Sequence, residues 1–420
     1  MDPPKILWLK ENLYDACYAR AAHFFSLPDY LVWRCTGKNV RSMCCLACKW
    51  LYKYDESEKR WDESFWRSIG LADLVDNEFG KIGGMRVENP FKNVNELTIS
   101  SEASEELGLC GSDLRVGVAM IDAHACSIGA LAVAKKYASS LKLSEILVIV
   151  SGTSACLMAS STRPTFIDGI WGPYYEAMLP GLWLNEAGQS ACGQLIQHIV
   201  TTHPAYSTLA DYDKQRMFDK LHIHLNEMAE KQNLTDISLL TRHVHIYPDF
   251  HGNRSPLSDP NMRGAVCGLS LDSSLDDLCV KYLACLQAIA YQTKQIVEKM
   301  QEKGIGIKLI TLVGGLATNP LYAQLIADIT RLPILVSRAK SDSIGLLGAS
   351  ILGASNSADL NGESIDGLFD LFAESFMDTN DLKLIEAARS AELERFHARK
   401  YEIYLKMLDD QRSYDKIMNN

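Results

Sequence analysis

The stretch that decides the fold is Lys308-Leu-Ile-Thr-Leu-Val-Gly-Gly-Leu-Ala-Thr-Asn-Pro320. It contains an apolar strand, a glycine pair (Gly314 and Gly315) and the start of a helix. Asparagine is favoured at a helix N-cap and proline at the first helical position, so the helix should begin at Asn319. A second apolar run, 334–337, follows that helix. A strand-helix-strand unit implies parallel strands, which predicts an α/β fold.

A second apolar strand lies upstream, at Ile146-Leu-Val-Ile-Val150. It leads into the turn Ser151-Gly-Thr-Ser-Ala155 and a return strand over 156–159. Backbone N–H groups and small hydroxyl side chains in such a turn can bind a polyphosphate, and glycines at the end of 308–313 let a base or phosphate approach the backbone. Each turn alone is more often only a turn. Two glycine-rich turns together favour a nucleotide site.

Two carboxylates are the candidate catalytic and substrate-binding groups. We expect the apolar run 116–121 to form a strand, which Asp122 ends before a helix of small residues begins. It is either a helix cap or a base that accepts a proton from a substrate hydroxyl, as kinases require. Glu186 lies in the aromatic and glycine-containing stretch 183–190, where it either binds polyol hydroxyls or occupies a surface loop.

Composition limits the class of partner. The 420 residues carry 42 Lys and Arg against 52 Asp and Glu, a net charge of −10, with 47% apolar residues. This balance argues against a nucleic-acid or membrane partner. We find no run of about 18 apolar residues and no signal sequence. Twelve cysteines without a signal sequence indicate reduced thiols and a cytoplasmic protein.

Three short patterns have the spacing of metal or redox sites. Cys45-Leu-Ala-Cys48 has no second pair at zinc-ribbon distance, so we favour core thiols. The pairs His222-x-His224 and His243-x-His245 would each share one face of a strand. No third ligand accompanies them, so we expect structural roles and assign no metal ligand.

The organisation along the chain suggests a domain boundary near 137–144. A long helix is expected over 272–302, with capping residues at its start, and a charged terminal helix over 381–410. No internal repeat or long linker interrupts the chain.

Taken together, several segments carry a resemblance that spans nearly the whole chain, in a common order. They are Pro3–Lys10, Leu27–Leu31, Cys48–Trp50, Ile121–Ala125, Ser151–Ser154, Glu186–Ser190, His251–Pro256 and Gly314–Leu321. Each segment is a weak motif, but their order makes the set specific. The chain resembles the FGGY family of carbohydrate kinases, and most closely its ribulokinase-like branch.

The resemblance implies an actin-like, ribonuclease-H-like fold of two domains with a cleft between them. We expect 1–136 to be a remnant of the N-terminal kinase domain on the sugar side. The C-terminal domain, on the nucleotide side, would span 145–380, and 381–420 would be the terminal helix.

The resemblance also implies the roles of the site residues. ATP and Mg²⁺ would be needed, with the metal bridging the phosphates. The general base would be Asp122, the sugar site Lys49, Asp122 and Glu186, the ATP phosphate contacts Gly152 and Thr153, and the adenosine contacts Gly314, Gly315 and Asn319.

Three departures from the family pattern stand out. Family members begin with a strand ending in Asp-x-Gly-Thr/Ser, whereas the resemblance here starts at Pro3, so we expect a truncated form with an incomplete first domain. The glycines that the family prefers after the catalytic aspartate are Cys126-Ser127 here. A glycine pair after the sugar-binding glutamate is Ala187-Gly188 here, and we expect both changes to add bulk near the site.

The function that follows is ATP-dependent phosphorylation of a sugar or polyol hydroxyl, most simply of a ketopentose such as ribulose. A homodimer would be compatible with it. The alternative is a truncated, non-catalytic protein that binds a ligand or regulates a partner through its second domain.

Overall fold

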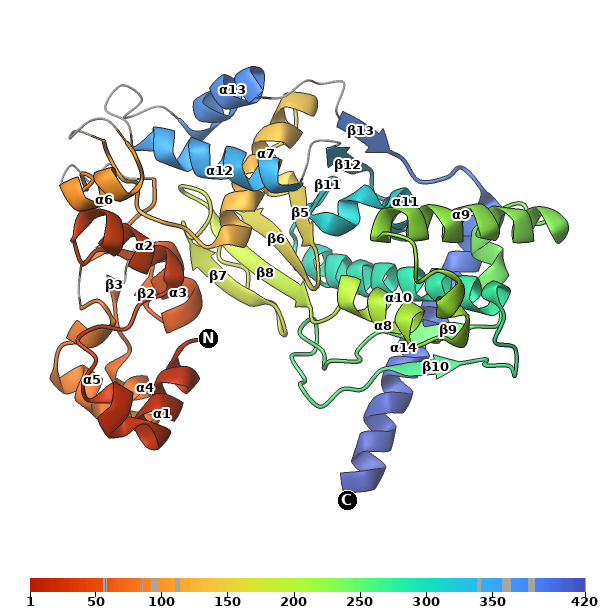
Figure 1. The fold of residues 1–420 in the computed structure, drawn as a ribbon, viewed down its shortest axis with the longest axis horizontal. Coiled ribbons are helices and arrows are strands. Elements are labelled where there is room, and N and C mark those ends of the chain that lie inside the picture. The colour runs from red at the N-terminus through yellow and green to blue at the C-terminus, as the bar shows by residue number, and fades with distance from the viewer. Residues whose placement is uncertain are drawn as a thin grey trace.

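The computed structural model describes residues 1–419 except 56, 58, 85, 92–96, 110–113, 338–340, 357–363 and 377–381. Its centre is a seven-stranded sheet with the order β13-β12-β11-β5-β6-β8-β7 (Figure 1). β12, β11 and β5 run parallel, and the remaining pairs are antiparallel. The strands are β5 (Ile146–Ser151), β6 (Ala155–Ser161), β7 (Trp171–Tyr175), β8 (Trp183–Gln189), β11 (Leu309–Val313), β12 (Ile334–Ser337) and β13 (Leu382–Ile385).

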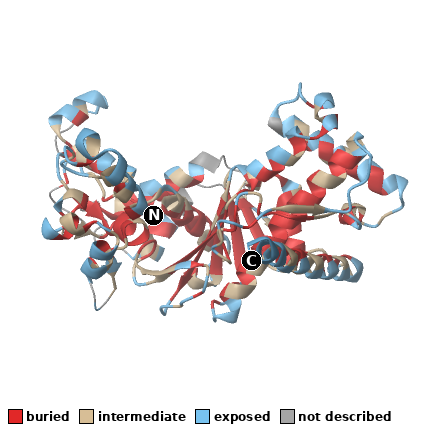
Figure 2. Ribbon diagram, turned by 90° about the horizontal axis from the view of Figure 1, so that it is seen from below, coloured by how far each residue is buried: buried red, intermediate tan, exposed pale blue. Residues whose placement is uncertain are grey.

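Both faces of this sheet are apolar and covered by helices. Successive side chains of a strand point to opposite faces, so Leu147 and Ile149 join one core cluster while Ile146 and Val148 join another. One face packs on α8, α10 and α11, and the other on α7, α12 and α13 (Figure 1). Figure 2 shows the buried residues concentrated along the sheet and the helices against it. These helices are α7 (Asp122–Tyr137), α8 (Gly193–Thr201), α10 (Leu275–Glu302), α11 (Pro320–Thr330), α12 (Ser341–Ser355) and α13 (Ile365–Phe376).

The strand and helix expectations around this sheet are largely confirmed. β11, α11 and β12 form the expected parallel unit, and Asn319 is the N-cap of α11. β5 and β6 form the expected hairpin. The expected helix over 272–302 is α10, with Ser274 as its N-cap.

Three expectations about elements were wrong. The terminal helix α14 (Ala391–Asn419) begins ten residues later than expected, because β13 pairs with the edge of the main sheet. His222 and His224 lie on α9 (Lys214–Lys231), so their spacing does not mark one face of a strand. The apolar run 116–121 forms no strand and leads directly into α7. An apolar run alone does not reveal whether a neighbouring strand is there to pair with it.

The N-terminal part has its own aromatic core. Its centre is formed by Trp61, whose ring stacks on Phe79 at 4.8 Å between centroids and contacts Trp66 edge-on. Large apolar side chains such as Trp8 and Leu31 are exposed on its surface. The elements are α1 (Pro3–Asn12), a π-helical turn (Tyr14–Tyr18), α2 (Leu27–Thr36), β1 (Arg41–Ser42), α3 (Met43–Trp50), β2 (Lys53–Tyr54), β3 (Lys59–Arg60), α4 (Glu63–Ser68), α5 (Ala72–Asp76), β4 (Val87–Glu88) and α6 (Ser101–Glu106).

At the opposite end of the molecule, α9 and α14 flank the long helix α10 (Figure 1). A short 3₁₀ segment, η5 (Ile237–Thr241), leads from α9 to the hairpin of β9 (His245–Tyr247) and β10 (Ala265–Cys267). Within the described ranges, no helix combines the length and the apolar content needed to cross a bilayer.

Helix α7 crosses α12 at a pair of glycines. A Cβ on Gly129 would clash with the carbonyl oxygen of Ile344, and one on Gly348 would clash with that of Ala125. Glycine at both positions therefore lets the two backbones touch. This crossing holds the start of α7, where Asp122 and His124 lie, against α12.

We predict that Gly129→Ala destabilises the protein by about 1–3 kcal/mol, because a methyl group must displace the backbone of α12. Gly345→Ala is the matched control, since a Cβ there meets nothing within 4 Å. The control should be neutral or stabilising by about 0.5–1 kcal/mol, because alanine is the better helix former. Urea denaturation measures both, and equal stability of the two variants would contradict the crossing.

Candidate functional site

A hollow of about 630 Å³ lies between α1, the 24–28 segment, α3 and the start of α7. We call it the sugar-side cavity. It brings together two of the predicted sugar-site residues, Lys49 from α3 and Asp122 from α7, which are 73 positions apart in the sequence. The other lining residues are Met1, Asp2, Lys5, Ile6, Leu9, Phe24, Phe25, Ser26, Leu27, Pro28, Cys45, Trp50 and Ile121.

Asp122 has the position of a free carboxylate. The N-cap of α7 is Ile121, and Asp122 is the first residue of the helix, so Asp122 is not the cap. Its Oδ1 accepts one hydrogen bond, 2.7 Å from the amide nitrogen of Ala123, and its side chain has no other partner in the described part of the chain. An exposed carboxylate at a cavity wall can accept a proton.

Lys49 supplies a cation to the same cavity. It lies in the last turn of α3, is half-buried, and its ammonium has no hydrogen bond or ion pair among the residues that the structure describes. Three ammonium hydrogens are therefore free to bind hydroxyl or carbonyl oxygens of a ligand.

Glu186 is not among the residues that line this cavity. It is on β8, its side chain is only 6% exposed, and its carboxylate accepts hydrogen bonds from two side chains. His124 Nε2 donates to its Oε2 at 3.2 Å, and Arg254 donates to its Oε1 at 3.2 Å. Burial raises the pKa of Glu186, but His124, Lys49 and Arg254 together outweigh burial and hold that pKa below its usual value. Glu186 is therefore a buried carboxylate.

His124 and Arg254 are the two residues that sequence reasoning missed. His124 is fully buried, and its Nδ1 lies 3.3 Å from the carbonyl oxygen of Ala177 and 3.2 Å from Cys44 Sγ. Its place two residues after Asp122 was a possible signal. Arg254 is in the segment 251–256, which carried the resemblance without a role.

Arg254 approaches the sheet where Gly188 leaves space. A Cβ on Gly188 would clash with the guanidinium of Arg254, which lies over the ring of Trp171 at 4.6 Å from its centroid. Ala187 belongs to the core cluster on the other face of the sheet from Glu186. The expectation that Ala187 and Gly188 add bulk near the site was therefore wrong. Gly188 leaves the space that the Arg254 side chain occupies.

Cys126 and Ser127, both expected to add bulk near the site, differ in their positions. Ser127 is buried, and its hydroxyl donates to the carbonyl oxygen of Ala123 at 2.8 Å, so it points away from the cavity wall. Cys126 lies one helical turn after Asp122, and burial, then the charge of Asp122, raise its pKa to about 11. Its thiol is therefore a neutral neighbour of Asp122 at physiological pH.

The two glycine-rich turns meet at the C-terminal ends of two central strands of the main sheet, β5 and β11. Val150 of β5 pairs with Val313 of β11, so the turns that follow these parallel strands lie side by side. A Cβ on Gly314, whose φ is 97°, would clash with the carbonyl oxygen of Ser151. Gly314 therefore allows the two turns to touch.

The turn at Gly152 and Thr153 rests on the start of α8. The carbonyl oxygens of these two residues accept hydrogen bonds from the amides of Cys192, Gly193 and Gln194 at 2.9–3.2 Å. Thr153 itself is exposed, and its hydroxyl is without a partner in the described residues. Its hydroxyl and amide therefore remain available for a phosphate.

Gly315 and Asn319 differ in what they can contribute. A Cβ on Gly315 would meet nothing within 4 Å, so the open space beside it can receive a base or ribose. Asn319 is buried; its Oδ1 accepts from the amides of Leu321 and Tyr322, and its Nδ2 donates to Tyr282 Oη at 2.8 Å. Asn319 shapes the turn as a helix cap.

A divalent metal would have few protein ligands here. No group of three or more His, Cys, Asp or Glu side chains with metal-binding geometry occurs among the described residues. Mg²⁺ in phosphoryl-transfer enzymes is held largely by substrate phosphates and water with one or two carboxylates, and Asp122 is a free carboxylate at the cavity. The site fits a metal that arrives with the nucleotide.

Comparison with known proteins places these features in one family. Residues 147–357 match the model of the FGGY family of carbohydrate kinases, C-terminal domain. An FGGY carbohydrate kinase domain-containing protein of Xenopus laevis is 42% identical over all of this chain and 74% of its own length. A D-ribulokinase of Saccharomyces cerevisiae is 37% identical over 86% of this chain and 53% of its own length.

A solved structure supports the fold. The crystal structure of a gluconate kinase from Lactobacillus acidophilus matches 99% of this chain and 73% of its own length, with a TM-score of 0.73 and 18% identity. At that identity the likeness concerns the fold, and it confirms the expected sugar-kinase architecture.

We predict that Glu186 and Arg254 are energetically coupled by about 1.5–3 kcal/mol, the range for hydrogen bonds to charged groups. The cycle uses Glu186→Gln, Arg254→Met and the double variant, with urea denaturation as the measurement. Methionine retains an apolar stem beside Trp171, so the cycle isolates the charge contact. If the two single changes lower the free energy of unfolding additively, Glu186 and Arg254 do not stabilise the fold through their contact.

Proposed function

The chain belongs to the FGGY family of carbohydrate kinases, and from this premise we propose that it transfers the γ-phosphoryl group of ATP to a terminal hydroxyl of a ketopentose. D-ribulose is the first candidate, because the D-ribulokinase of Saccharomyces cerevisiae aligns with 86% of this chain. The observation that carries the proposal is that one cavity contains both a free carboxylate, Asp122, and a free ammonium, Lys49.

Asp122 is the general base in this proposal. Its carboxylate accepts the proton of the sugar hydroxyl while the hydroxyl oxygen forms a bond to the γ-phosphorus and the bond from that phosphorus to the ADP oxygen breaks. No other carboxylate is needed for the proton. Mg²⁺, when bound with the nucleotide, would neutralise charge on the phosphate oxygens.

Lys49 orients the sugar, and Glu186 holds the side chains beside the site. Lys49 can donate to hydroxyl or carbonyl oxygens in the sugar-side cavity. Glu186 accepts hydrogen bonds from His124 and Arg254, and it keeps these two side chains and the start of α7 in place. Holding the acceptor hydroxyl in line with the γ-phosphate accounts for much of the catalysis of phosphoryl transfer.

The glycine-rich turns form the nucleotide side. We infer that the amide and hydroxyl of Thr153, with the backbone of Gly152, contact the phosphates. The open space beside Gly315 would receive the adenosine, and Gly314 and Asn319 would shape that turn. The cytoplasm, where ATP and free pentoses are available, is the compartment that this activity suits.

We predict that Asp122→Asn lowers kcat for D-ribulose by at least about 10²-fold while ATP affinity changes little, because only the proton acceptor is removed. Asp2→Asn is the matched control, since Asp2 is a second carboxylate of the same cavity. The control should retain most of its turnover in a coupled ADP-release assay. Near-full turnover of Asp122→Asn would contradict the assignment, and sugar or ATP binding without turnover by the unaltered chain would favour the non-catalytic alternative.

We predict that Gly315→Val weakens ATP binding by at least about tenfold and leaves D-ribulose binding nearly unchanged, because the side chain fills the space given to the nucleotide. Gly306→Val is the control: a Cβ at Gly306 also meets nothing within 4 Å, but Gly306 precedes β11. Calorimetric titration with ATP and with D-ribulose separates the two effects. An equal loss of both affinities, with a lower melting temperature, would show that Gly315 only serves the turn.

A further inference from the structure

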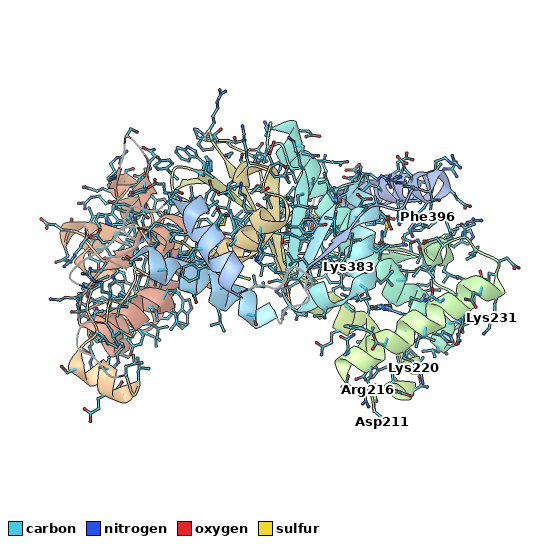
Figure 3. All side chains as sticks on the ribbon, turned by 90° about the horizontal axis from the view of Figure 1, so that it is seen from above. Asp211, Arg216, Lys220, Lys231, Lys383 and Phe396 are labelled. Atoms are coloured by element: carbon cyan, nitrogen blue, oxygen red, sulfur yellow. The ribbon has the colours of Figure 1, made fainter. Side chains whose placement is uncertain are left out.

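A second hollow, of about 490 Å³, lies between η5 and α14, at the end of the molecule opposite the N-terminal helices. Figure 3 labels Phe396, one of its lining residues, at that end. We call it the cationic pocket, and it is lined by Leu239, Arg242, Glu392, Arg395, Phe396, Arg399, Lys400 and Ile403. Nothing in the proposed phosphoryl transfer uses it.

The charges of this pocket are unbalanced. Arg242, Arg395 and Arg399 are exposed, and within the described residues their guanidinium groups have no hydrogen bond or ion pair. Glu392 is the one acidic lining residue, and its Oε2 accepts from Thr235 Oγ1 at 2.7 Å. Three unpaired guanidinium groups therefore surround one concave space in a chain whose net charge is −10.

Two cations close to the pocket do have acidic partners. Nearby cations of the same region are paired: Arg331 with Glu394 at 3.9 Å, and Lys406 with Asp410 at 3.7 Å. Arg395 and Arg399 are four positions apart on α14, a spacing at which like charges destabilise a helix. An anion bound between them would remove that repulsion.

Lys400 is the buried lining residue that connects the two sides of the pocket. It is buried, and its ammonium donates to the carbonyl oxygens of Thr241 and Val244 and to His245 Nδ1, at 2.5–3.1 Å. All three hydrogens are used, so α14 is tied to the segment that carries Arg242. The position of Arg242 opposite Arg395 and Arg399 is thereby set before any ligand arrives.

We propose that the cationic pocket binds a small phosphate ester with two or more negative charges. Guanidinium groups match phosphate oxygens in bidentate geometry, and the pocket is within the volume range of small-molecule sites. Leu239, Phe396 and Ile403 offer apolar surface to the carbon part of the ester. The concave shape and the acidic chain around it favour a soluble small molecule over an anionic membrane.

The test uses inorganic pyrophosphate as the probe, titrated calorimetrically into the full chain with EDTA present and at about 50 mM salt, where screening is weak. Arg395→Gln with Arg399→Gln should weaken binding by at least about tenfold, the loss expected from two charged hydrogen-bonding groups. Lys406→Gln with Lys416→Gln removes the same charge from α14 outside the pocket and should change binding by less than about twofold.

Two outcomes would overturn the proposal. One is equal pyrophosphate affinity of the two double variants. That result would mean that pyrophosphate binds through the net charge of the helix or at another site. The other is binding to phosphatidylserine vesicles with no saturable binding of pyrophosphate, which would indicate a membrane surface. Unchanged melting temperatures of both double variants establish that folding is not the cause.

Discussion

The arrangement of the site depends on one buried charge, the carboxylate of Glu186. A carboxylate on the inner part of a sheet is tolerated only when it is paired and hydrogen-bonded. His124 satisfies it from α7 and Arg254 satisfies it from the loop that follows β9. The same contacts therefore fix three elements that are far apart in the sequence. Asp122 is two residues before His124, so the contact between His124 and Glu186 also positions the proposed base.

Glycines make this arrangement sterically possible. Gly188 lets the guanidinium of Arg254 lie on β8, and Gly129 with Gly348 lets α7 lie on α12. Gly314 lets the two nucleotide-side turns touch. At each of these positions the absence of a side chain allows a different close contact. Gly315 instead has open space beside it. The contrast separates glycines that serve packing from one that leaves room for a ligand.

Much of the fold was predictable from local patterns. The apolar runs that became β5, β11 and β12, the cap at Asn319 and the turns at 152–153 and 314–315 were all evident, because their signals are local. β13 was missed because its pairing partner, β12, is far away in the sequence, and the histidines of α9 were placed on a strand because a two-residue spacing does not define secondary structure. His124, Arg254 and the cationic pocket were missed for the same reason: their meaning arises only when distant segments meet.

The central claim is that the sugar-side cavity holds the acceptor hydroxyl at Asp122. A crystal structure of the chain with D-ribulose and a non-hydrolysable ATP analogue tests it most directly. The account predicts a terminal hydroxyl oxygen within hydrogen-bond distance, about 2.6–3.2 Å, of the Asp122 carboxylate, with Lys49 on another sugar oxygen. A sugar bound away from Asp122, or an analogue bound away from the turns at Thr153 and Gly315, would contradict it.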